Sequence, residues 1–438
     1  MAALGQAFMR PRIHPAPLPT SQVAPPGIIR RDLVASTADG AAYSVMVGCG
    51  ETYIGAYALA MGLSPLELGL LASVPLLGGA LVQLVSPIAV RRLGTNRGWV
   101  IGCGLVQGAA FLPLAWWAVV GRVDTLPLFL AVGLYWAAGM STTGAWNAWI
   151  GTLVPGRIRA NYFARRNRLS QAGVLMSFVV AGLLLQAAES RGRVLDAFAV
   201  VFAVAAAARF LSIGFLARCR ETERPERRPP RRLTLPQAIH ALLTEPATSI
   251  VAMLWGMTAA AQFAGPYFTP FMLEELGFSY WTYMLVVAAG FLAKIVALPL
   301  HGRLAGRLGP RRLLTLAAIA TVPLPLLWIP WSHAVYLVGV QLLAGGCWAA
   351  YELGICLVFF DAISHQERAG VVSAYNVGLA TATVAGSGAG GLLLDGLGEG
   401  FAAYASLFTV SSLLRLAVVM LLGRRGSPTS QVEGNRDS

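Results

Sequence analysis

Charged side chains are scarce in this chain, and their scarcity excludes most classes of soluble protein. Of the 438 residues, 12% are charged and 56% are hydrophobic, and the mean hydropathy is +0.64. An ordinary soluble domain carries roughly 25% charged residues. Apolar runs of about 18 residues or more, the length that a membrane-spanning helix needs, recur along the whole chain. We therefore predict a polytopic helical membrane protein.

The sequence also lacks the residue patterns of common enzymes and metalloproteins. Its five cysteines form no CxxC pair, so neither a disulfide framework nor a zinc site is indicated. No phosphate-binding P-loop, Ser-His-Asp set or cluster of metal-ligating residues is present in the sequence. We accordingly predict no catalytic residue, no bound metal and no cofactor, and we do not expect this chain to use ATP directly.

Lysine is almost absent, because Lys294 is the only one among the 33 basic residues. A net charge of +13 is compatible with nucleic-acid binding. Here, however, the arginines lie in short segments between apolar runs and build no separate basic domain. We therefore expect no nucleic-acid partner, and we interpret the charge as a signal of membrane topology.

The apolar runs between polar segments predict twelve membrane spans, six on each side of a polar break. The first six are Ala38–Gly62, Leu66–Val90, Gly98–Val120, Leu126–Val154, Gln171–Ala188 and Ala197–Ala217. The second six are Thr248–Leu273, Tyr280–Leu300, Leu313–Trp331, Ala334–Phe360, Val371–Leu394 and Phe401–Leu422. The predicted domains are a disordered tail (1–35), an N-terminal six-helix half (36–217), a linker (218–247), a C-terminal six-helix half (248–423) and a second tail (424–438).

The loop charges orient these spans. With the N-terminus inside the cell, the cytoplasmic segments carry 27 of the 33 basic residues and the outside loops carry three. This bias follows the positive-inside rule. We therefore expect both termini and the linker in the cytoplasm. The expected location is the lipid bilayer of the plasma membrane, the inner membrane in a bacterium, and the expected state is a monomer.

Short motifs recur between the two halves at a nearly constant spacing. Gly62–Ser64 recurs as Gly277–Ser279, 215 residues later. Arg92–Gly94 recurs as Arg307–Gly309 at the same offset. Five such matches occur in the same order along the chain, and their offset drifts by only nine residues. We infer a duplicated six-span unit, and two parallel six-helix halves are the architecture of one large class of transporters.

The segment from Gly302 to Arg312 carries a more specific resemblance. Its sequence GRLAGRLGPRR is similar to the G-x-L-A-D-R-x-G-R-R loop signature of the major facilitator superfamily, with Gly306 in place of the aspartate. The corresponding segment of the first half departs further, because Pro87 replaces the first glycine and Arg91 the aspartate. The resemblance covers roughly residues 30 to 425 and implies an all-α bundle of twelve transmembrane helices in two pseudo-repeated halves. The expected gate motif residues are Gly302, Arg307, Gly309 and Arg311, with Arg92 and Gly94 in the first half.

Three ionisable residues deep inside predicted spans are candidates for proton coupling: Glu51, Lys294 and Glu352. Such a residue costs about 2.5–3.5 kcal/mol to insert, so it usually faces a cavity or a partner. The resemblance makes the eighth and tenth helices neighbours, which predicts an ion pair between Lys294 and Glu352. The alternative is that Lys294 extends along its own helix to the inner surface.

Three other charged residues have a structural interpretation. Asp39 lies near the inner end of the first span, where we expect an interfacial position. Arg209 and Arg415 occupy matching positions in the sixth and twelfth spans. We expect both arginines to anchor their helices by extending toward the inner surface.

Polar and aromatic residues recur at helical spacing on the first, fourth, seventh and tenth spans. In the tenth span, Gln341, Gly345, Trp348 and Glu352 are spaced by four, three and four residues, so they share one face. The resemblance implies that these four helices line a central cavity. The candidate cavity residues are Trp136, Thr143, Trp146, Asn147, Gln262, Gln341, Trp348 and Tyr351. The alternative is that they only hold helices together.

These features predict a secondary transporter that moves a small organic solute by alternating access and is coupled to protons. The tryptophans on the expected cavity helices favour an amphipathic or aromatic solute. A uniporter and a sodium-coupled carrier are alternatives of the same type. From a different class, the alternative is a membrane enzyme or receptor that uses a similar scaffold.

Overall fold

The computed structural model describes residues 26–221, 247–362, 368–398 and 400–423, and these residues contain helices and no strand. The predicted linker (218–247) and the predicted tail 424–438 therefore lie mostly or wholly outside the described residues. Helix α1 begins at Pro26, so residues 26–35, which we assigned to the N-terminal tail, are helical. Residues 1–25 lie outside the described residues.

The N-terminal half consists of the helices before the linker. They are α1 (Pro26–Cys49), η2 (Glu51–Tyr53), α2 (Ile54–Ala60), α3 (Pro65–Gln83), α4 (Ser86–Leu93), α5 (Asn96–Ala109), α6 (Phe111–Val120), α7 (Thr125–Leu153), α8 (Gly156–Glu189) and α9 (Val194–Leu216). The C-terminal half consists of the helices after it. They are α11 (Ala247–Gln262), η3 (Gly265–Tyr267), α12 (Phe268–Pro270), η4 (Phe271–Glu275), α13 (Tyr280–Leu308), α14 (Pro310–Thr321), η5 (Leu326–Trp328), α15 (Ala334–Ala362), α16 (Arg368–Leu397) and α17 (Phe401–Gly423).

Each of the twelve predicted spans falls on one of these helices or on a broken run of them. Ten described helical segments are long and apolar enough to cross a membrane. The first and seventh predicted spans are not among the ten. The first is interrupted between α1 and α2, and α1 is long enough but carries four charged residues. The seventh is interrupted after Gln262, which leaves α11 only 16 residues long. In the seventh, Pro266 and Pro270 coincide with the break, as expected for a residue without a backbone N–H.

Several span boundaries differ from the prediction. The second span divides into α3 and α4, and α4 begins at Ser86-Pro87, where proline is compatible with a helix start. Helix α8 begins at Gly156 rather than near Gln171, so the arginines assigned to a loop lie in its first turns. Helix α13 continues to Leu308, beyond the predicted end at Leu300.

The repeated glycine motifs have a local structural cause. Gly62 and Gly277 have φ values of +84° and +61°, which favour glycine, and each precedes a serine that caps the next helix. The Ser64 hydroxyl accepts a hydrogen bond from the Glu67 N–H, and the Glu67 carboxylate accepts one from the Ser64 N–H. The repeat therefore preserves the turn that starts the second span of each half.

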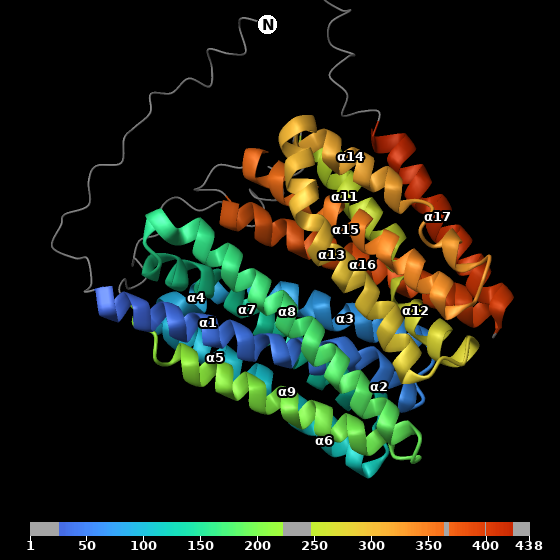
Figure 1. Cartoon of the computed structure of the whole chain (residues 1–438), viewed down its shortest axis with the longest axis horizontal. Coiled ribbons are helices and arrows are strands. Elements are labelled where there is room, and N and C mark those ends of the chain that lie inside the picture. The colour runs from blue at the N-terminus through green and yellow to red at the C-terminus, as the bar shows by residue number, and fades with distance from the viewer. Residues whose placement is uncertain (1–25, 222–246, 363–367, 399, 424–438) are drawn as a thin grey trace, which may run out of the picture.

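Figure 1 shows the two halves meeting near α2 and α12 and diverging toward the end of α4 and the beginning of α14. The buried side chains agree with this arrangement. One core cluster combines both halves, including Tyr53 and Tyr57 with Tyr267 and Tyr283. Toward the other end, the C-terminal half has its own core around Leu314, and the N-terminal half has a separate one with the fully buried Trp149.

We call the meeting region the closed end, defined by Gly69, Gln186, Tyr267 and Trp281. Helix α3 packs there against α16, and α8 packs against α13. The Trp281 N–H donates a hydrogen bond to Gln186 Oε1 at 2.8 Å, and the Tyr267 hydroxyl donates to the carbonyl of Ser387, beside Gly69.

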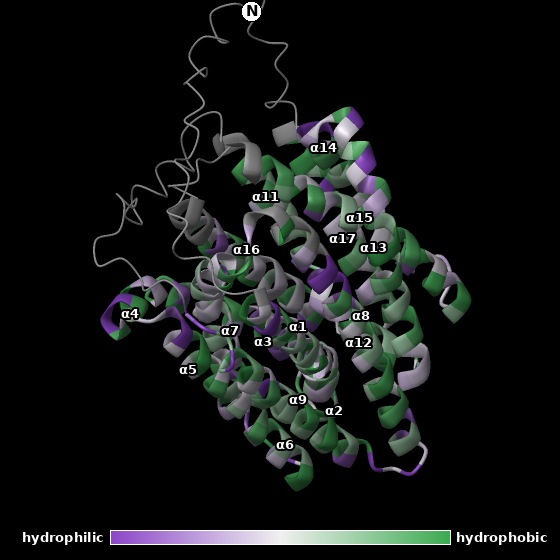
Figure 2. Cartoon of the chain, turned by 60° about the vertical axis from the view of Figure 1, so that its left-hand side comes forward, coloured by the Kyte–Doolittle hydropathy of each residue, from purple (hydrophilic) through white to green (hydrophobic). Residues whose placement is uncertain are grey.

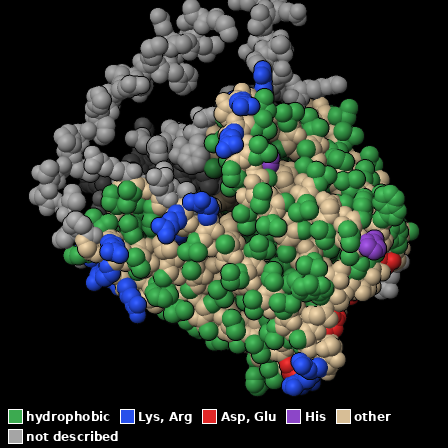
Figure 3. Space-filling model, in the orientation of Figure 1, with side chains coloured by type: hydrophobic (Ala, Val, Ile, Leu, Met, Phe, Trp, Pro, Cys, Tyr) green, Lys and Arg blue, Asp and Glu red, His purple; other side chains and the backbone are tan. Residues whose placement is uncertain are grey.

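We call the opposite region the arginine-rich end, defined by Arg31, Arg92, Arg307 and Arg311. In Figure 3, most Lys and Arg side chains in view lie toward this end, and the Asp and Glu side chains in view lie at the other. Figure 2 shows hydrophobic residues along the helices and hydrophilic ones concentrated near helix ends such as those of α4 and α14. This distribution is typical of a protein whose helix sides face lipid.

Candidate functional site

The structure places Lys294 and Glu352 in an ion pair between α13 and α15. Lys294 Nζ lies 2.7 Å from Glu352 Oε1 and 2.5 Å from Oε2. The two helices approach closely because neither Gly290 nor Gly345 has a side chain: a Cβ on Gly345 would lie 2.2 Å from the Gly290 carbonyl oxygen. The lysine and glutamate side chains are 36% and 52% exposed, so the pair is only partly covered by protein.

The other mid-span carboxylate, Glu51, lies where the first span is broken between α1 and α2. Its Oε2 accepts a hydrogen bond from the Tyr135 hydroxyl of α7. Tyr135 is 2% exposed and packs edge-to-face against Phe111, with the ring centroids 5.0 Å apart. Glu51 in the N-terminal half and Glu352 in the C-terminal half are therefore each bonded to a side chain of a neighbouring helix.

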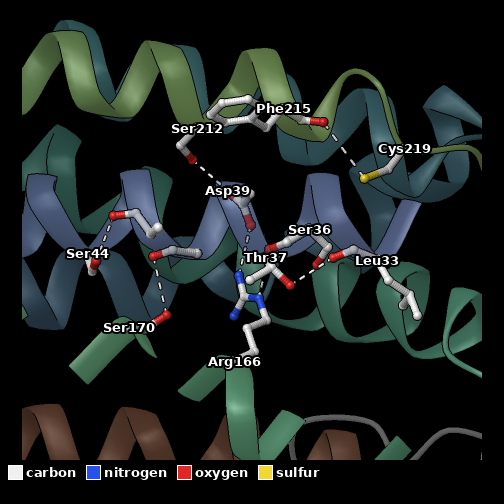
Figure 4. Close-up of polar contacts among 12 residues, drawn as sticks. Leu33, Ser36, Thr37, Asp39, Ser44, Arg166, Ser170, Ser212, Phe215 and Cys219 are labelled. Carbon is white, nitrogen blue, oxygen red and sulfur yellow. Dashed lines mark hydrogen bonds and ion pairs between the residues drawn. The ribbon is translucent and has the colours of Figure 1, made fainter. Parts of the chain in front are cut away.

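Asp39 is not interfacial, which corrects the position expected from the sequence. It is 3% exposed and lies between α1, α8 and α9 (Figure 4). Arg166 Nη2 lies 2.8 Å from Asp39 Oδ2, and Arg166 Nε donates to the carbonyl of Ser36 at 3.0 Å. Ser212 Oγ donates to Asp39 Oδ1 at 2.7 Å and accepts from Arg209 Nη1 at 2.9 Å. These bonds satisfy a charge that burial alone makes costly.

The prediction that Arg209 and Arg415 extend to the surface is also wrong, because each is 3% exposed. Arg209 bonds Ser212 and lies 5.1 Å from the Tyr43 ring centroid. Arg415 Nη1 donates to the carbonyl of Thr321 at 2.8 Å, and its guanidinium lies 5.7 Å from the Trp348 ring centroid. Arg209 is held by Ser212 of its own helix and the Tyr43 ring of α1, whereas both contacts of Arg415 come from neighbouring helices.

The candidate cavity residues of α7 lie along one helix but differ in exposure. Thr143 and Asn147 are exposed, whereas Trp136 and Trp146 are half-buried. Trp136 packs edge-to-face with Tyr135, with ring centroids 5.5 Å apart. The Arg166 guanidinium lies 4.5 Å from the Trp146 ring centroid, so this tryptophan covers the Asp39 network from the α7 side.

The candidate cavity residues of the C-terminal half lie on two helices and differ in their surroundings. Gln262 and Gln341 are half-buried, with Gln262 folded toward Gly265 and Gln341 beside Gly290. Trp348 is half-buried and packs at 88° against Tyr351. Tyr351 is 4% exposed and belongs to the core of the C-terminal half, so it does not lie on an open surface in this structure.

The gate motif residues lie mostly on helices rather than in a loop. Gly302 and Arg307 belong to α13, and Arg311 to α14; all three are exposed. Arg92 and Arg307 occupy the last turns of α4 and α13, where a positive charge is favourable. The glycines that follow them, Gly94 and Gly309, have φ values of +68° and +83° and end the two helices.

Sequence reasoning missed Arg166 and Tyr135. Arg166 was counted as a loop charge because hydropathy placed the fifth span after it. The signal for a longer helix was present, since no proline or glycine occurs between Gly156 and Gly173. Tyr135 gave no comparable signal, because a tyrosine in an apolar run has the same pattern as a core residue. Within the described residues, no group of three potential metal ligands is found.

Comparison with known proteins identifies the fold. The sequence model of the Major Facilitator Superfamily matches residues 40–279 and 250–437. Among curated proteins, none matches the chain by sequence.

Similar solved structures share the fold at low identity. A point mutant of the nucleoside transporter NupG is 14% identical with a TM-score of 0.67, over 90% of this chain and 100% of that one. The xylose transporter XylE from E. coli, partially occluded and inward open, is 10% identical with a TM-score of 0.64, over 91% and 98%. A D-xylose-proton symporter is 15% identical with a TM-score of 0.63, over 89% and 97%.

Proposed function

The chain belongs to the major facilitator superfamily, and on that basis we propose that it is a secondary active transporter of a small organic solute, coupled to protons. The similar structures are named as transporters of nucleosides and xylose, and one is named as a proton symporter. The observation that carries the proposal of coupling is that Glu51 in one half and Glu352 in the other each bond a side chain of a neighbouring helix, Tyr135 and Lys294 respectively.

The distribution of buried side chains supports alternating access. At the closed end one core joins the halves, whereas toward the arginine-rich end each half has its own core. A rocking motion that separates the joint core and closes the other end requires no rearrangement inside either half. With the arginine-rich end in the cytoplasm, as the positive-inside rule favours, this structure corresponds to an inward-facing state.

The ion pair of the C-terminal half offers a step that couples proton uptake to motion. Protonation of Glu352 removes the charge that holds Lys294, and an anionic group of a solute competes for the same lysine. Either event removes the ion pair between α13 and α15, whereas the close packing at Gly290 and Gly345 remains. A carboxyl group that is hydrated in one state and dry in the other binds a proton on one side of the membrane and releases it on the other.

The aromatic side chains support an amphipathic or aromatic solute. Trp136, Trp146 and Trp348 are each half-buried, so part of each ring is accessible while the rest is fixed by packing. Such rings supply large apolar contact area and a polar N–H at little entropic cost. Thr143 and Asn147 add exposed hydrogen-bonding groups on α7.

The test begins with a thermal-shift screen of the purified protein to find a ligand, followed by transport in proteoliposomes. Counterflow of the labelled ligand without a gradient measures carrier activity, and accumulation driven by a pH gradient measures coupling. We expect Glu51→Gln or Glu352→Gln to keep counterflow and to lower accumulation at least about tenfold. Asp196→Asn, an exposed carboxylate of a surface ion pair, serves as the control.

Each alternative predicts a different result. If both Gln variants keep pH-driven accumulation, these carboxylates do not couple protons. Accumulation driven only by sodium identifies a sodium-coupled carrier, and counterflow without accumulation under any gradient identifies a uniporter. Ligand binding without counterflow contradicts transport and favours a receptor or an enzyme.

A further inference from the structure

A pocket of about 480 Å³ lies between the beginning of α1 and the end of α9, at the arginine-rich end. Figure 1 shows these two helix ends side by side. The pocket contains none of the residues assigned above to coupling or to the solute. Its lining residues are Arg31, Val34, Ala35, Ala38, Phe215 and Arg218.

The pocket carries two uncompensated positive charges. Arg31 and Arg218 are both exposed, and no ion pair involves either of them within the described residues. The acid next in sequence to Arg31, Asp32, is 1% exposed and is paired with Arg220 at 2.9 Å. The Arg218 guanidinium lies 5.6 Å from the Phe215 ring centroid. Among the described residues, therefore, no carboxylate competes with an external anion for these two cations.

An apolar strip continues from these charges along the helices. Ala35 and Ala38 line the pocket with small side chains that leave room for a ligand, and Val34, which also lines it, is 62% exposed. On α9, Leu211 lies one turn before Phe215 and is 56% exposed, so it extends the strip toward the middle of the bilayer. A soluble anion gains nothing from this strip, whereas an acyl chain does.

We propose that this pocket binds an anionic phospholipid, with its phosphate between Arg31 and Arg218 and an acyl chain along α1 and α9. Guanidinium groups bind phosphate oxygens through paired, charge-assisted hydrogen bonds. Basic pockets between transmembrane helices at the cytoplasmic surface are a known way to recognise such headgroups. The site is independent of the transport proposal, because it uses none of the same residues.

The test measures retention of phosphatidylglycerol by the purified full-length protein, using native mass spectrometry with phosphatidylcholine as the neutral reference. Removing one arginine near the surface is expected to lower affinity about fivefold, so Arg31→Ala with Arg218→Ala should lower it about thirtyfold. The matched control is Arg303→Ala with Arg312→Ala, which removes two exposed arginines of the same end outside the pocket. We expect the control to change affinity less than about twofold.

Two outcomes overturn the proposal. One is an equal loss of phosphatidylglycerol in the test and control variants, which indicates attraction to the net charge alone. The other is full displacement of the lipid by inorganic phosphate at the same concentration, which indicates a site for a free anion. If the double variant does not fold, Arg31→Gln and Arg218→Gln are measured singly, and an unchanged affinity in both also contradicts the site.

Discussion

Each half of the molecule holds an ion pair between two of its long helices, and the two pairs differ in burial. In the N-terminal half, the side chains of Arg166 and Asp39 are 17% and 4% exposed. In the C-terminal half, Lys294 and Glu352 are 36% and 52% exposed. The buried aspartate also accepts a hydrogen bond from Ser212, whereas the only hydrogen bond described for the Glu352 carboxylate is the one from Lys294.

This difference separates a structural role from a proposed functional one. A buried pair with additional hydrogen bonds fixes the helices that contribute to it, and removing one partner leaves a charge that neither protein nor water compensates. A partly exposed pair costs less to break, because water replaces part of the lost interaction. We therefore expect the Asp39 network to remain intact during transport and the Lys294–Glu352 pair to open.

The largest predicted effect follows from breaking the buried pair. Asp39→Asn keeps the size of the side chain but removes the charge that holds Arg166, and the expected loss of stability is about 3–5 kcal/mol. The measurement is thermal unfolding of the purified protein in detergent. The control is Asp196→Asn, whose pair with Arg193 is exposed and is expected to contribute at most about 1 kcal/mol. Equal stability of the two variants contradicts a structural role for Asp39.

The second prediction concerns the exposed pair and transport. Lys294→Glu and Glu352→Lys each place two like charges side by side, so each is expected to abolish accumulation of solute and to lower stability modestly. The double variant restores opposite charges and should recover part of the transport. Counterflow and accumulation in proteoliposomes are the measurements. If the double variant transports no more solute than either single variant, the attraction between the two charges has no role in transport.

The sequence was sufficient to predict the C-terminal pair but not the N-terminal one. Lys294 and Glu352 lie at similar depths in helices that the family resemblance makes neighbours. Arg166 was excluded from any span because hydropathy is averaged over a window of residues. Several arginines in the first turns of α8 lower that average, so the predicted span begins too late. Hydropathy therefore located the twelve spans, but it did not detect charges that a helix carries into the bundle.

The sequence pattern also did not predict which helices surround each side chain. The spacing of Gln341, Trp348 and Glu352 places them on one helix face. It does not predict which helices pack against Tyr351, the residue next to that face. Tyr351 is buried in the core of the C-terminal half, which combines residues of α11, α13, α14, α15 and α16. Gly50, at the break in the first span, also packs against a helix distant in sequence, since a Cβ there would lie 2.6 Å from the Phe111 ring.

The smallest predicted effect tests how α13 and α15 hold the exposed pair together. Gly345→Ala adds a methyl group that would lie 2.2 Å from the Gly290 carbonyl oxygen and 3.0 Å from Ala293 Cβ. Since the nearest atom belongs to the backbone of α13, which cannot rotate away as a flexible side chain can, the helices must separate, and the expected cost is about 1–3 kcal/mol. The matched control is Gly346→Ala, which meets nothing within 4 Å and is expected to be neutral or stabilising.

A combination with Lys294→Ala shows whether this packing serves the ion pair. If helix separation weakens the contact between Lys294 and Glu352, part of the cost of Gly345→Ala is the cost of the weakened pair. Gly345→Ala and Lys294→Ala together then destabilise the protein by less than the sum of the single changes, with a coupling of about 0.5 kcal/mol or more. Gly346→Ala with Lys294→Ala should be additive. If the effects of Gly345→Ala and Lys294→Ala are additive, the close packing of α13 and α15 does not contribute to the stability of the ion pair, because the flexible side chains of Lys294 and Glu352 then keep their contact when the helices separate.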